Sequence, residues 1–115
     1  MADCLFCKVV AGEVPAKVVK RTEEAVAFRD IDPEAPTHVL VIPTRHIPAV
    51  RDVKGAGSDG LLGRLLTFSA EVATELGLDA KGYRIVTNTG PDAGQSVDHL
   101  HFHILGGRRL TWPPG

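Results

Sequence analysis

The segment His99–Leu105 constrains the fold more than any other part of the sequence, because it alternates histidine with apolar residues. Successive side chains of a β-strand point to opposite faces of a sheet. The alternation therefore predicts a strand over Asp98–Leu105 with two distinct faces. One face carries His99, His101 and His103, and the opposite face packs into the core with Leu100, Phe102 and Ile104. A shift of one residue would exchange the two faces, so the apolar row fixes the register.

Three interpretations of the histidine row follow from these residues alone. The row is a solvated strand face, a triplet of metal ligands, or a nucleophile with acid–base partners. The loop just before it, Asn88–Ser96, carries glycine together with hydroxyl and amide side chains. Backbone N–H groups and short polar side chains of this kind suit the oxygens of a phosphate. The combination favours the third interpretation.

The rest of the chain predicts an α+β domain built on an antiparallel sheet. Residues with a preference for strands predict four further strands, over Lys17–Lys20, Ala25–Asp30, Val39–Ile42 and Tyr83–Asn88.

Two helices are expected as well. Apolar residues recur at three- and four-residue intervals from Leu61 to Leu76, which predicts one long helix. Ser58 or Asp59 can cap its start, and Gly77 can end it in a left-handed conformation. The glycines of residues 52–60 indicate a surface loop before it, and a shorter helix is expected around residues 6–11.

Composition excludes several classes of function. The chain has 115 residues, which is one domain's worth, with 13 basic and 14 acidic side chains. Because no excess of Lys and Arg is available to neutralise phosphates, binding driven by charge to nucleic acid or to a membrane surface is not expected. Apolar runs are short and the N-terminus lacks the pattern of a signal peptide. We therefore expect a cytoplasmic protein.

The histidine row and its flanks resemble the histidine-triad (HIT) family of nucleotide hydrolases and transferases. The row has the pattern His-φ-His-φ-His-φ-φ, where φ is apolar, and Gly94-Gln95-Ser96-Val97 precedes it. Gly106-Gly107-Arg108 and the terminal Trp112-Pro113-Pro114-Gly115 look like the Hint branch, the purine nucleoside phosphoramidases. The similarity extends upstream through Asp30–His38 and covers nearly the whole chain. It implies a single HIT domain over residues 1–115, with a five-stranded antiparallel sheet, one long helix and one short helix.

The resemblance also implies a reaction. His101 would be the nucleophile that forms a covalent nucleotidyl-histidine, and the bond cleaved would be the P–N bond of a purine nucleoside 5′-phosphoramidate. His103 would bind the phosphate oxygens, His38 would belong to the same proton network, and Ser96 would contact the leaving atom. No catalytic metal is required.

The same resemblance implies a nucleotide site. Asp30 would accept hydrogen bonds from the ribose hydroxyls, and the phosphate end would be held by Asn88, Gly94 and Gln95. The base slot would be formed by Leu5, Phe6, Val9, Phe28, Ile31 and Leu40, although simple core packing explains each of these six residues, taken singly, slightly better.

Cys4 and Cys7 form a C-x-x-C pair at the start of the chain. From the residues alone, the pair is half of a zinc site, two reduced core thiols, or a redox pair. Some Hint-like proteins use such a pair with two histidines to bind zinc. By that resemblance a structural Zn²⁺ would be held by Cys4, Cys7, His46 and His99, which leaves His101 and His103 for catalysis.

Hint-like domains form homodimers whose sheets join. The resemblance implies that residues 106–115 form a C-terminal tail reaching the partner subunit, where Trp112 would help to shape the leaving-group pocket. One departure stands out, because relatives usually carry an aromatic residue at position 98 and this chain has Asp98. A carboxylate on the core face would be costly, so either the strand begins after Asp98 or a cation such as Arg84 pairs with it.

Rival functions remain open at this point. A dinucleotide polyphosphate hydrolase of the neighbouring branch shares the triad, and a nucleotide-binding regulatory module with weak turnover would keep the same residues. A nucleotidyltransferase typically has Gln at the third triad position, where this chain has His103. A metalloenzyme would place all three triad histidines on one ion.

Overall fold

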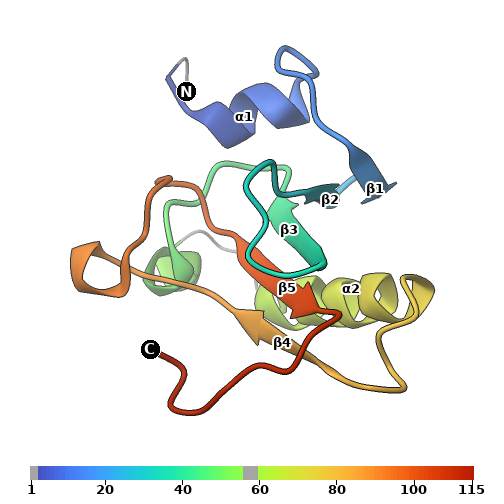
Figure 1. Cartoon of the computed structure of the whole chain (residues 1–115). Helices are drawn as coiled ribbons and strands as arrows, with labels where there is room; N and C mark the ends of the chain where they lie inside the picture. Colours follow the sequence, from blue (N-terminus) through green and yellow to red (C-terminus); the bar gives the residue numbers. More distant parts are fainter. Residues whose placement is uncertain (1–2, 56–59) are drawn as a thin grey trace.

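A five-stranded antiparallel sheet forms the centre of the computed structural model, which describes residues 3–55 and 60–115 (Figure 1). The strands lie in the order β1-β2-β3-β5-β4. Their bounds are β1 Val18–Arg21, β2 Ala25–Arg29, β3 Thr37–Pro43, β4 Tyr83–Val86 and β5 Phe102–Gly106. The predicted α+β class and the five predicted strands are confirmed.

The long helix α2, Leu61–Glu75, covers one face of the sheet. Its apolar stripe packs on the sheet through Leu65, Phe68 and Val72, which are buried against residues such as Val39 and Ile104. Burial of each large side chain of this kind stabilises the fold by about 1.5–3 kcal/mol. The predicted end of the helix is confirmed, since Gly77 has φ +78°. At the other end Gly60, with φ +79°, precedes the helix and offers no side-chain cap, while Ser58 and Asp59 lie outside the described residues.

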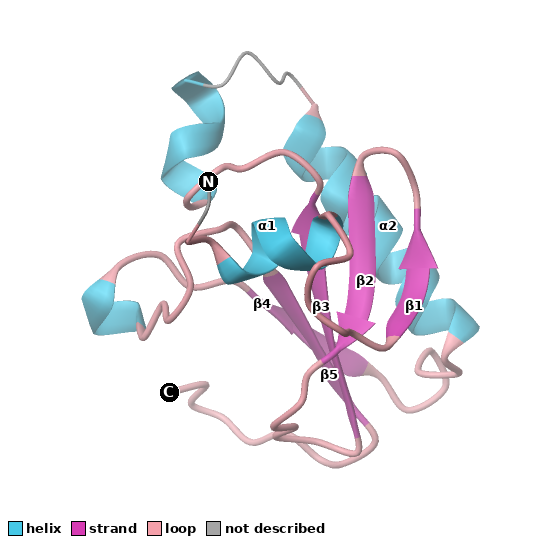
Figure 2. Cartoon of the chain, turned by 90° about the horizontal axis from the view of Figure 1, so that it is seen from above, coloured by secondary structure: helices cyan, strands magenta, loops and turns pink. Residues whose placement is uncertain are grey.

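The short helix α1, Leu5–Val10, covers the opposite face (Figure 2). Phe6 and Val9 pack there against Val26, Phe28, Leu40 and Ile42, in a second apolar cluster separate from that of α2. Cys4 caps the helix, because its Sγ accepts a hydrogen bond from the Cys7 N–H at 3.3 Å.

The strand that contains part of the histidine row, β5, starts later than predicted. β5 begins at Phe102 rather than at Asp98, so His99 lies in a bend and His101 in irregular chain before the strand. The last ladder pair is Val41 with Phe102. Beyond it β3 reaches Pro43, which has no N–H to donate, and the Leu100 N–H instead donates to the Ile47 carbonyl. Asp98 is therefore exposed outside the strand, which is the first of the two expected alternatives, a strand that begins after Asp98.

Two smaller expectations also change. Val50–Gly55 is a 3-10 helix, η1, rather than loop, and a second one, η2, spans Pro91–Ala93. β4 ends at Val86, two residues earlier than predicted. In residues 3–55 and 60–115, helices are too short and too polar to cross a bilayer.

Candidate active site and metal centre

His101 is held in a single orientation by backbone contacts. Its Nδ1 lies 2.7 Å from the carbonyl oxygen of His99, and its own carbonyl accepts a hydrogen bond from Thr87 Oγ1 at 2.8 Å. A carbonyl oxygen only accepts, so Nδ1 carries the proton and Nε2 keeps its lone pair. The Phe6 ring packs edge-on against the imidazole, with centroids 5.1 Å apart. The buried ring therefore offers one nucleophilic nitrogen with little freedom to rotate.

His103 and His38 form a hydrogen-bonded pair whose tautomers are set by the backbone. The Glu34 N–H donates to His38 Nδ1 at 3.0 Å, so the proton of His38 lies on Nε2. That Nε2–H points at His103 Nδ1, 2.9 Å away, which leaves the proton of His103 on its own Nε2. His103 consequently presents an N–H donor, the group that a phosphate oxygen needs.

Burial is the main cause that lowers the pKa of His103, to about 4, and the neighbouring His101 and His38 rings add to it. The carboxylate of Asp30 acts in the opposite direction. Its Oδ2 lies 3.5 Å from His38 Nε2, and its Oδ1 accepts the Asp32 N–H at 2.8 Å. His103 is therefore uncharged at neutral pH.

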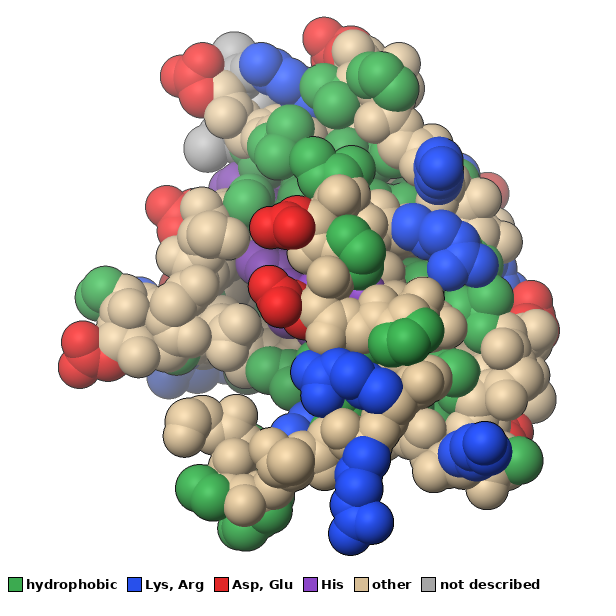
Figure 3. All heavy atoms as spheres, viewed as in Figure 1, with side chains coloured by type: hydrophobic (Ala, Val, Ile, Leu, Met, Phe, Trp, Pro, Cys, Tyr) green, Lys and Arg blue, Asp and Glu red, His purple; other side chains and the backbone are tan. Residues whose placement is uncertain are grey.

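A cavity of about 230 Å³ opens beside these rings. Figure 3 shows histidine side chains at the bottom of a hollow with acidic side chains at its rim. The structure brings to this cavity, which we call the nucleoside cavity after the ligand that the resemblance implies, every residue expected in the base slot, together with Asp30, Ser96, His101 and His103. Phe6, Val9, Phe28 and Leu40 are both core and wall, while Ile31 is 98% exposed at the rim.

Sequence reasoning missed part of this wall. Val14, Pro15 and Ala16, in the connection between α1 and β1, and Arg29 also line the nucleoside cavity. An apolar loop of three residues has no periodicity, so no sequence pattern distinguishes it from any other connection.

The loop Asn88–Ser96 differs from the open phosphate cradle that the sequence suggested. The N–H groups of Gly94 and Gln95 donate to the carbonyls of Pro91 and Gly90 within the loop. The Gln95 amide is also engaged, since Oε1 accepts the Gly90 N–H and Nε2 donates to the carbonyls of Pro48 and Val97. Gln95 therefore braces the loop and lines neither cavity beside His103.

A second cavity, of about 340 Å³, lies on the other side of His103. It is lined by His38, His103 and Asn88 from the site, by Arg84 and Arg108, and by parts of the C-terminal tail. Trp112 is 80% exposed and is not part of its wall. Within one chain, therefore, the structure does not bring Trp112 to the site.

Four potential metal ligands meet beneath α1. The donor atoms of Cys4, Cys7, His46 and His99 all lie within 4.8 Å of one another. His99 Nδ1 is 3.4 Å from Cys4 Sγ and 3.6 Å from Cys7 Sγ, and His46 Nδ1 is 3.3 Å from Cys7 Sγ. A tetrahedral zinc ion with ordinary bond lengths separates a sulfur from a nitrogen ligand by about 3.6 Å. The group fits such an ion.

The chemistry of the donors also suits a metal. His99 Nε2 lies 2.9 Å from the Pro43 carbonyl, so Nε2 carries the proton and Nδ1 offers its lone pair to the group. Burial lowers the pKa of His99, which keeps the ring neutral. Burial and the adjacent Cys4 raise the pKa of Cys7, so a metal would displace a thiol proton as it binds.

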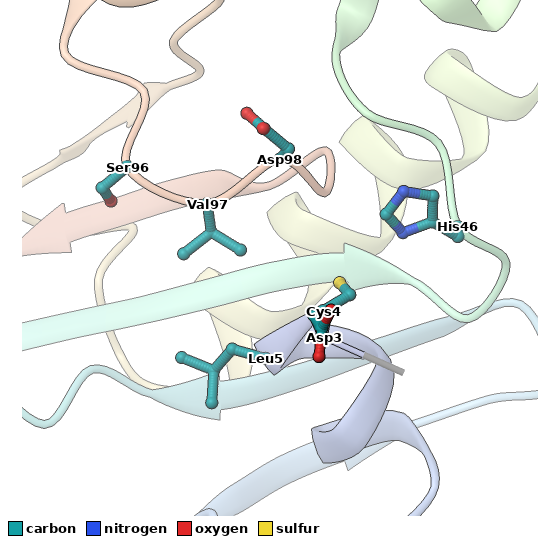
Figure 4. Close-up of a pocket in the computed structure, with 7 residues that line it drawn as sticks. All are labelled: Asp3, Cys4, Leu5, His46, Ser96, Val97 and Asp98. Atoms are coloured by element: carbon teal, nitrogen blue, oxygen red, sulfur yellow. The ribbon is translucent and has the colours of Figure 1, made fainter. Parts of the chain in front are cut away.

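Solvent reaches this group through the largest cavity described, about 540 Å³ (Figure 4). Cys4 and His46 line it together with Asp3, Asp98 and parts of the neighbouring segments. It contains neither His101 nor His103. The candidate metal centre and the nucleoside cavity thus open separately, on either side of Leu5, Ser96 and Val97, which border both.

Comparisons with known proteins decide the family. The model of the HIT domain matches residues 11–110. The chain belongs to the HIT family. This HIT protein is 47% identical over 113 residues to an uncharacterized HIT-like protein of Synechococcus elongatus, covering 98% of the chain and 97% of the relative. It is 44% identical over 108 residues to the purine nucleoside phosphoramidase of Escherichia coli K12, covering 94% of the chain and 90% of that enzyme.

Solved structures agree with this assignment. A HIT family hydrolase from Legionella pneumophila superposes with a TM-score of 0.92 at 49% identity, covering 98% of this chain and 100% of its own. A HIT family hydrolase from Clostridium thermocellum gives a TM-score of 0.91 at 40% identity, covering 96% of each chain. The HIT fold is thereby established for this chain, and the similarity to HIT family hydrolases supports a hydrolase.

The HIT triad is divided between two centres in this structure. Among the described residues, His99 groups with the cysteines, whereas His101 and His103 face each other across 5.1 Å between ring centroids and share no metal-ligand group with it. A single ion bound by all three rings does not fit this arrangement. A solvated strand face does not fit either, because His99 and His101 are buried.

Proposed function

We propose that this HIT protein hydrolyses the P–N bond of purine nucleoside 5′-phosphoramidates, releasing a nucleoside monophosphate and an amine. The observation that carries the proposal is the hydrogen bond from His101 Nδ1 to the His99 carbonyl, which leaves the Nε2 lone pair beside the nucleoside cavity. The similarity to the phosphoramidase of E. coli supports the substrate class.

The reaction proceeds through a covalent intermediate on His101. Nε2 attacks phosphorus, a P–N bond to the ring forms, and the P–N bond to the leaving amine breaks. The electron pair goes to the leaving nitrogen, which takes up a proton with help from the Ser96 hydroxyl. The phosphorylated ring is a cation, and the His99 carbonyl stabilises it through Nδ1–H. Water then attacks phosphorus and restores the neutral ring.

The remaining residues bind and orient the nucleotide. The His103 Nε2–H donates to a phosphate oxygen, and His38 holds His103 in the tautomer that allows this. Asn88 contributes at the phosphate end, Asp30 accepts from the ribose hydroxyls, and the apolar wall around Phe6 and Leu40 receives the base. An apolar slot of this kind rejects neither adenine nor guanine strongly.

Three further assignments belong to this proposal. The centre formed by Cys4, Cys7, His46 and His99 holds a structural Zn²⁺, which would fix α1 to the sheet and takes no part in the reaction. The domain, residues 1–115, works as a homodimer whose tail, residues 106–115, reaches the partner subunit. Because both cysteines are free thiols, the reducing cytoplasm is the compartment that suits it.

Hydrolysis of adenosine 5′-phosphoramidate, measured beside hydrolysis of diadenosine polyphosphates, tests the proposal. The wild-type protein should prefer the phosphoramidate. His101→Ala should lower kcat by about three orders of magnitude or more, because the nucleophile is lost. Adenosine monophosphate should still bind that variant, and this binding, measured by calorimetry, is the control for folding.

Two results would contradict the assignment. Near-normal turnover by His101→Ala would remove His101 as the nucleophile. A preference for the diadenosine compounds would move the protein to the dinucleotide polyphosphate branch.

A further inference from the structure

The two thiols at the start of α1 lie where they can form a disulfide with each other. Cys4 is the N-cap residue of α1, and Cys7 lies in its first turn. Cα atoms three residues apart along a helix are separated by about 5 Å, which is within the range of about 4.4–6.8 Å found across disulfides. The two Sγ atoms also belong to the four donor atoms that lie within 4.8 Å of one another. The pair can therefore be bridged with little movement of the backbone.

One thiol of the pair is open to solvent, and the other lies behind it. Cys4 lines the cavity of about 540 Å³, and Figure 4 draws it among the residues of that wall. Cys7 is half-buried and does not line the cavity. A small oxidant such as hydrogen peroxide therefore reaches Cys4 first. Cys7 is then in place as the second thiol that completes the disulfide.

The chain between the two cysteines belongs to the nucleoside cavity. Leu5 and Phe6 are the two residues that separate Cys4 from Cys7, and both of them line that cavity. The Phe6 ring also packs edge-on against His101, with centroids 5.1 Å apart. A covalent change at the cysteines is thus transmitted to the wall of the cavity through two residues of the same helical turn.

Oxidation would also remove half of the proposed zinc ligands. A disulfide carries no thiolate, so the two imidazoles would be left from the group of Cys4, Cys7, His46 and His99. α1 has six residues, too few for a helix that is stable alone in water. The packing of its apolar side chains on the sheet would then have to hold it without the metal. The oxidised helix should therefore leave the sheet more often.

We propose that Cys4 and Cys7 form a reversible oxidation site, whose conversion to a disulfide by a peroxide lowers the affinity for the nucleotide. The Cys4 thiolate attacks one peroxide oxygen, the O–O bond breaks, and a sulfenic acid and hydroxide form. The Cys7 thiolate attacks the sulfenic sulfur, the S–S bond forms, and a second hydroxide leaves. The hydroxides take up two protons, from the thiols or, when a metal is bound, from solvent. In total, two thiols and one hydrogen peroxide give one disulfide and two waters.

The inference rests on the proposed function for its effect but not for its chemistry. The disulfide requires the two thiols and a peroxide, whereas the change in affinity requires the proposed zinc centre and nucleotide site. A dithiol reductant reverses the reaction by thiol–disulfide exchange. Disulfides in a reducing cytoplasm are usually transient and redox-sensing, which suits a pair of partly exposed thiols.

The experiment takes the zinc-loaded wild-type protein through one cycle of oxidation and reduction. After hydrogen peroxide, mass spectrometry should find a loss of about 2 Da in the peptide that contains both cysteines, and a chelating dye should detect about one released zinc per disulfide. Calorimetry should find the affinity for adenosine monophosphate lowered by about threefold or more, as expected if α1 is docked for a third of the time or less. Dithiothreitol and zinc together should restore the mass, the metal and the affinity.

Two controls separate the disulfide from other effects of peroxide. Cys4→Ser/Cys7→Ser has no cysteine left, so peroxide should not change its affinity for adenosine monophosphate, whereas oxidation of Met1 or Trp112 would still act on it. Removal of the metal from the reduced wild-type protein with a chelator should lower the affinity as far as oxidation does. Peroxide added after the chelator should then lower it no further.

A reciprocal measurement uses the wild-type protein alone and does not depend on whether the double variant folds. If the disulfide lowers the affinity for adenosine monophosphate by some factor, saturating adenosine monophosphate must shift the equilibrium towards the two thiols by the same factor. The ratio of reduced to oxidised protein in a glutathione buffer, measured by alkylation, should therefore rise by about threefold or more when the nucleotide is added.

Two outcomes would overturn the inference. One is that peroxide does not join Cys4 to Cys7. The other is that the disulfide forms while the affinity for adenosine monophosphate stays at that of the reduced protein. Absence of phosphoramidate hydrolysis by the reduced protein would instead overturn the proposed function alone, because the disulfide and the affinity are both measured without turnover.

Discussion

His99 and His101 are two residues apart and have opposite tautomers. The ring of His99 donates from Nε2 to the Pro43 carbonyl, which leaves Nδ1 for the cysteine thiols. The ring of His101 donates from Nδ1 to the carbonyl of His99, which leaves Nε2 for phosphorus. One backbone carbonyl thus connects the proposed metal centre to the proposed nucleophile. A shift of the His99 backbone would therefore change the orientation of the His101 ring.

His103 gives the stability of the protein a dependence on pH. Its pKa is lowered to about 4 in the folded protein, against about 6.5 in an unfolded chain. Between these values the folded state binds fewer protons than the unfolded state, so the free energy of unfolding rises with pH. This contribution is complete above about pH 6.5 and is lost as the pH falls towards 4.

Urea unfolding at pH 7.5 and at pH 5 measures this effect. The wild-type protein should lose more free energy of unfolding between the two pH values than His103→Gln, which lacks the titrating ring. Equal losses in the two proteins would show that His103 does not carry the dependence.

At the scale of elements, α1 depends on contacts with the rest of the protein for its stability. Six residues are too few for a helix to be stable alone in water. Two constraints hold it, the packing of Phe6 and Val9 on the sheet and the proposed zinc bound through Cys4 and Cys7. The same helix supplies Leu5, Phe6 and Val9 to the nucleoside cavity. Metal binding and nucleotide binding should therefore be linked.

Removal of the metal tests this link. Elemental analysis should find about one zinc per chain, and Cys7→Ser should lose it. We expect the Tm of that variant to fall by about 10 °C or more, and its affinity for adenosine monophosphate to fall as well. Lys8→Ala, on the same helix, should keep both the metal and the affinity. A wild-type protein that is metal-free and equally stable would contradict the zinc assignment.

The elements themselves were predictable because their residues repeat with the period of a strand or a helix. The Leu61–Leu76 stripe predicted α2 to within one residue, and the alternation of His99–Leu105 predicted β5, although with a start four residues too early. Their ends were not predictable, because a distant partner sets them. β5 begins at Phe102, whose ladder partner in β3 is Val41, 61 residues away in the sequence, and the ladder does not continue to Pro43.

The site follows the same rule. Residues on regular elements, such as Phe28, Leu40 and His103, could be assigned from the resemblance, and the structure brings them together. The brace formed by Gln95 and the wall formed by Val14–Ala16 depend on how loops close over the sheet. Residue types alone do not predict how these loops close.

At the scale of the whole molecule, β4 forms one edge of the sheet, and within residues 3–55 and 60–115 it pairs only with β5. β4 is an edge strand, and an unpaired edge offers N–H and C=O groups to a second chain. The tail runs next to it, since Arg84 of β4 holds the carbonyl of Thr111. Trp112 follows directly and is 80% exposed. A large aromatic side chain in this position is typical of an interface anchor.

We therefore expect a homodimer in sedimentation equilibrium at micromolar concentration, with Trp112→Ala raising the dimer Kd by at least about thirtyfold. Leu66→Ala is the matched control, because Leu66 is an exposed apolar side chain, 44% accessible, that belongs to α2 and not to β4 or the tail. That variant should dimerise like the wild type. If Trp112 also shapes the partner's leaving-group pocket, Trp112→Ala will raise KM for phosphoramidates even at concentrations where the dimer is fully formed. A wild-type protein that sediments as a monomer would contradict the assembly and this role of the tail together.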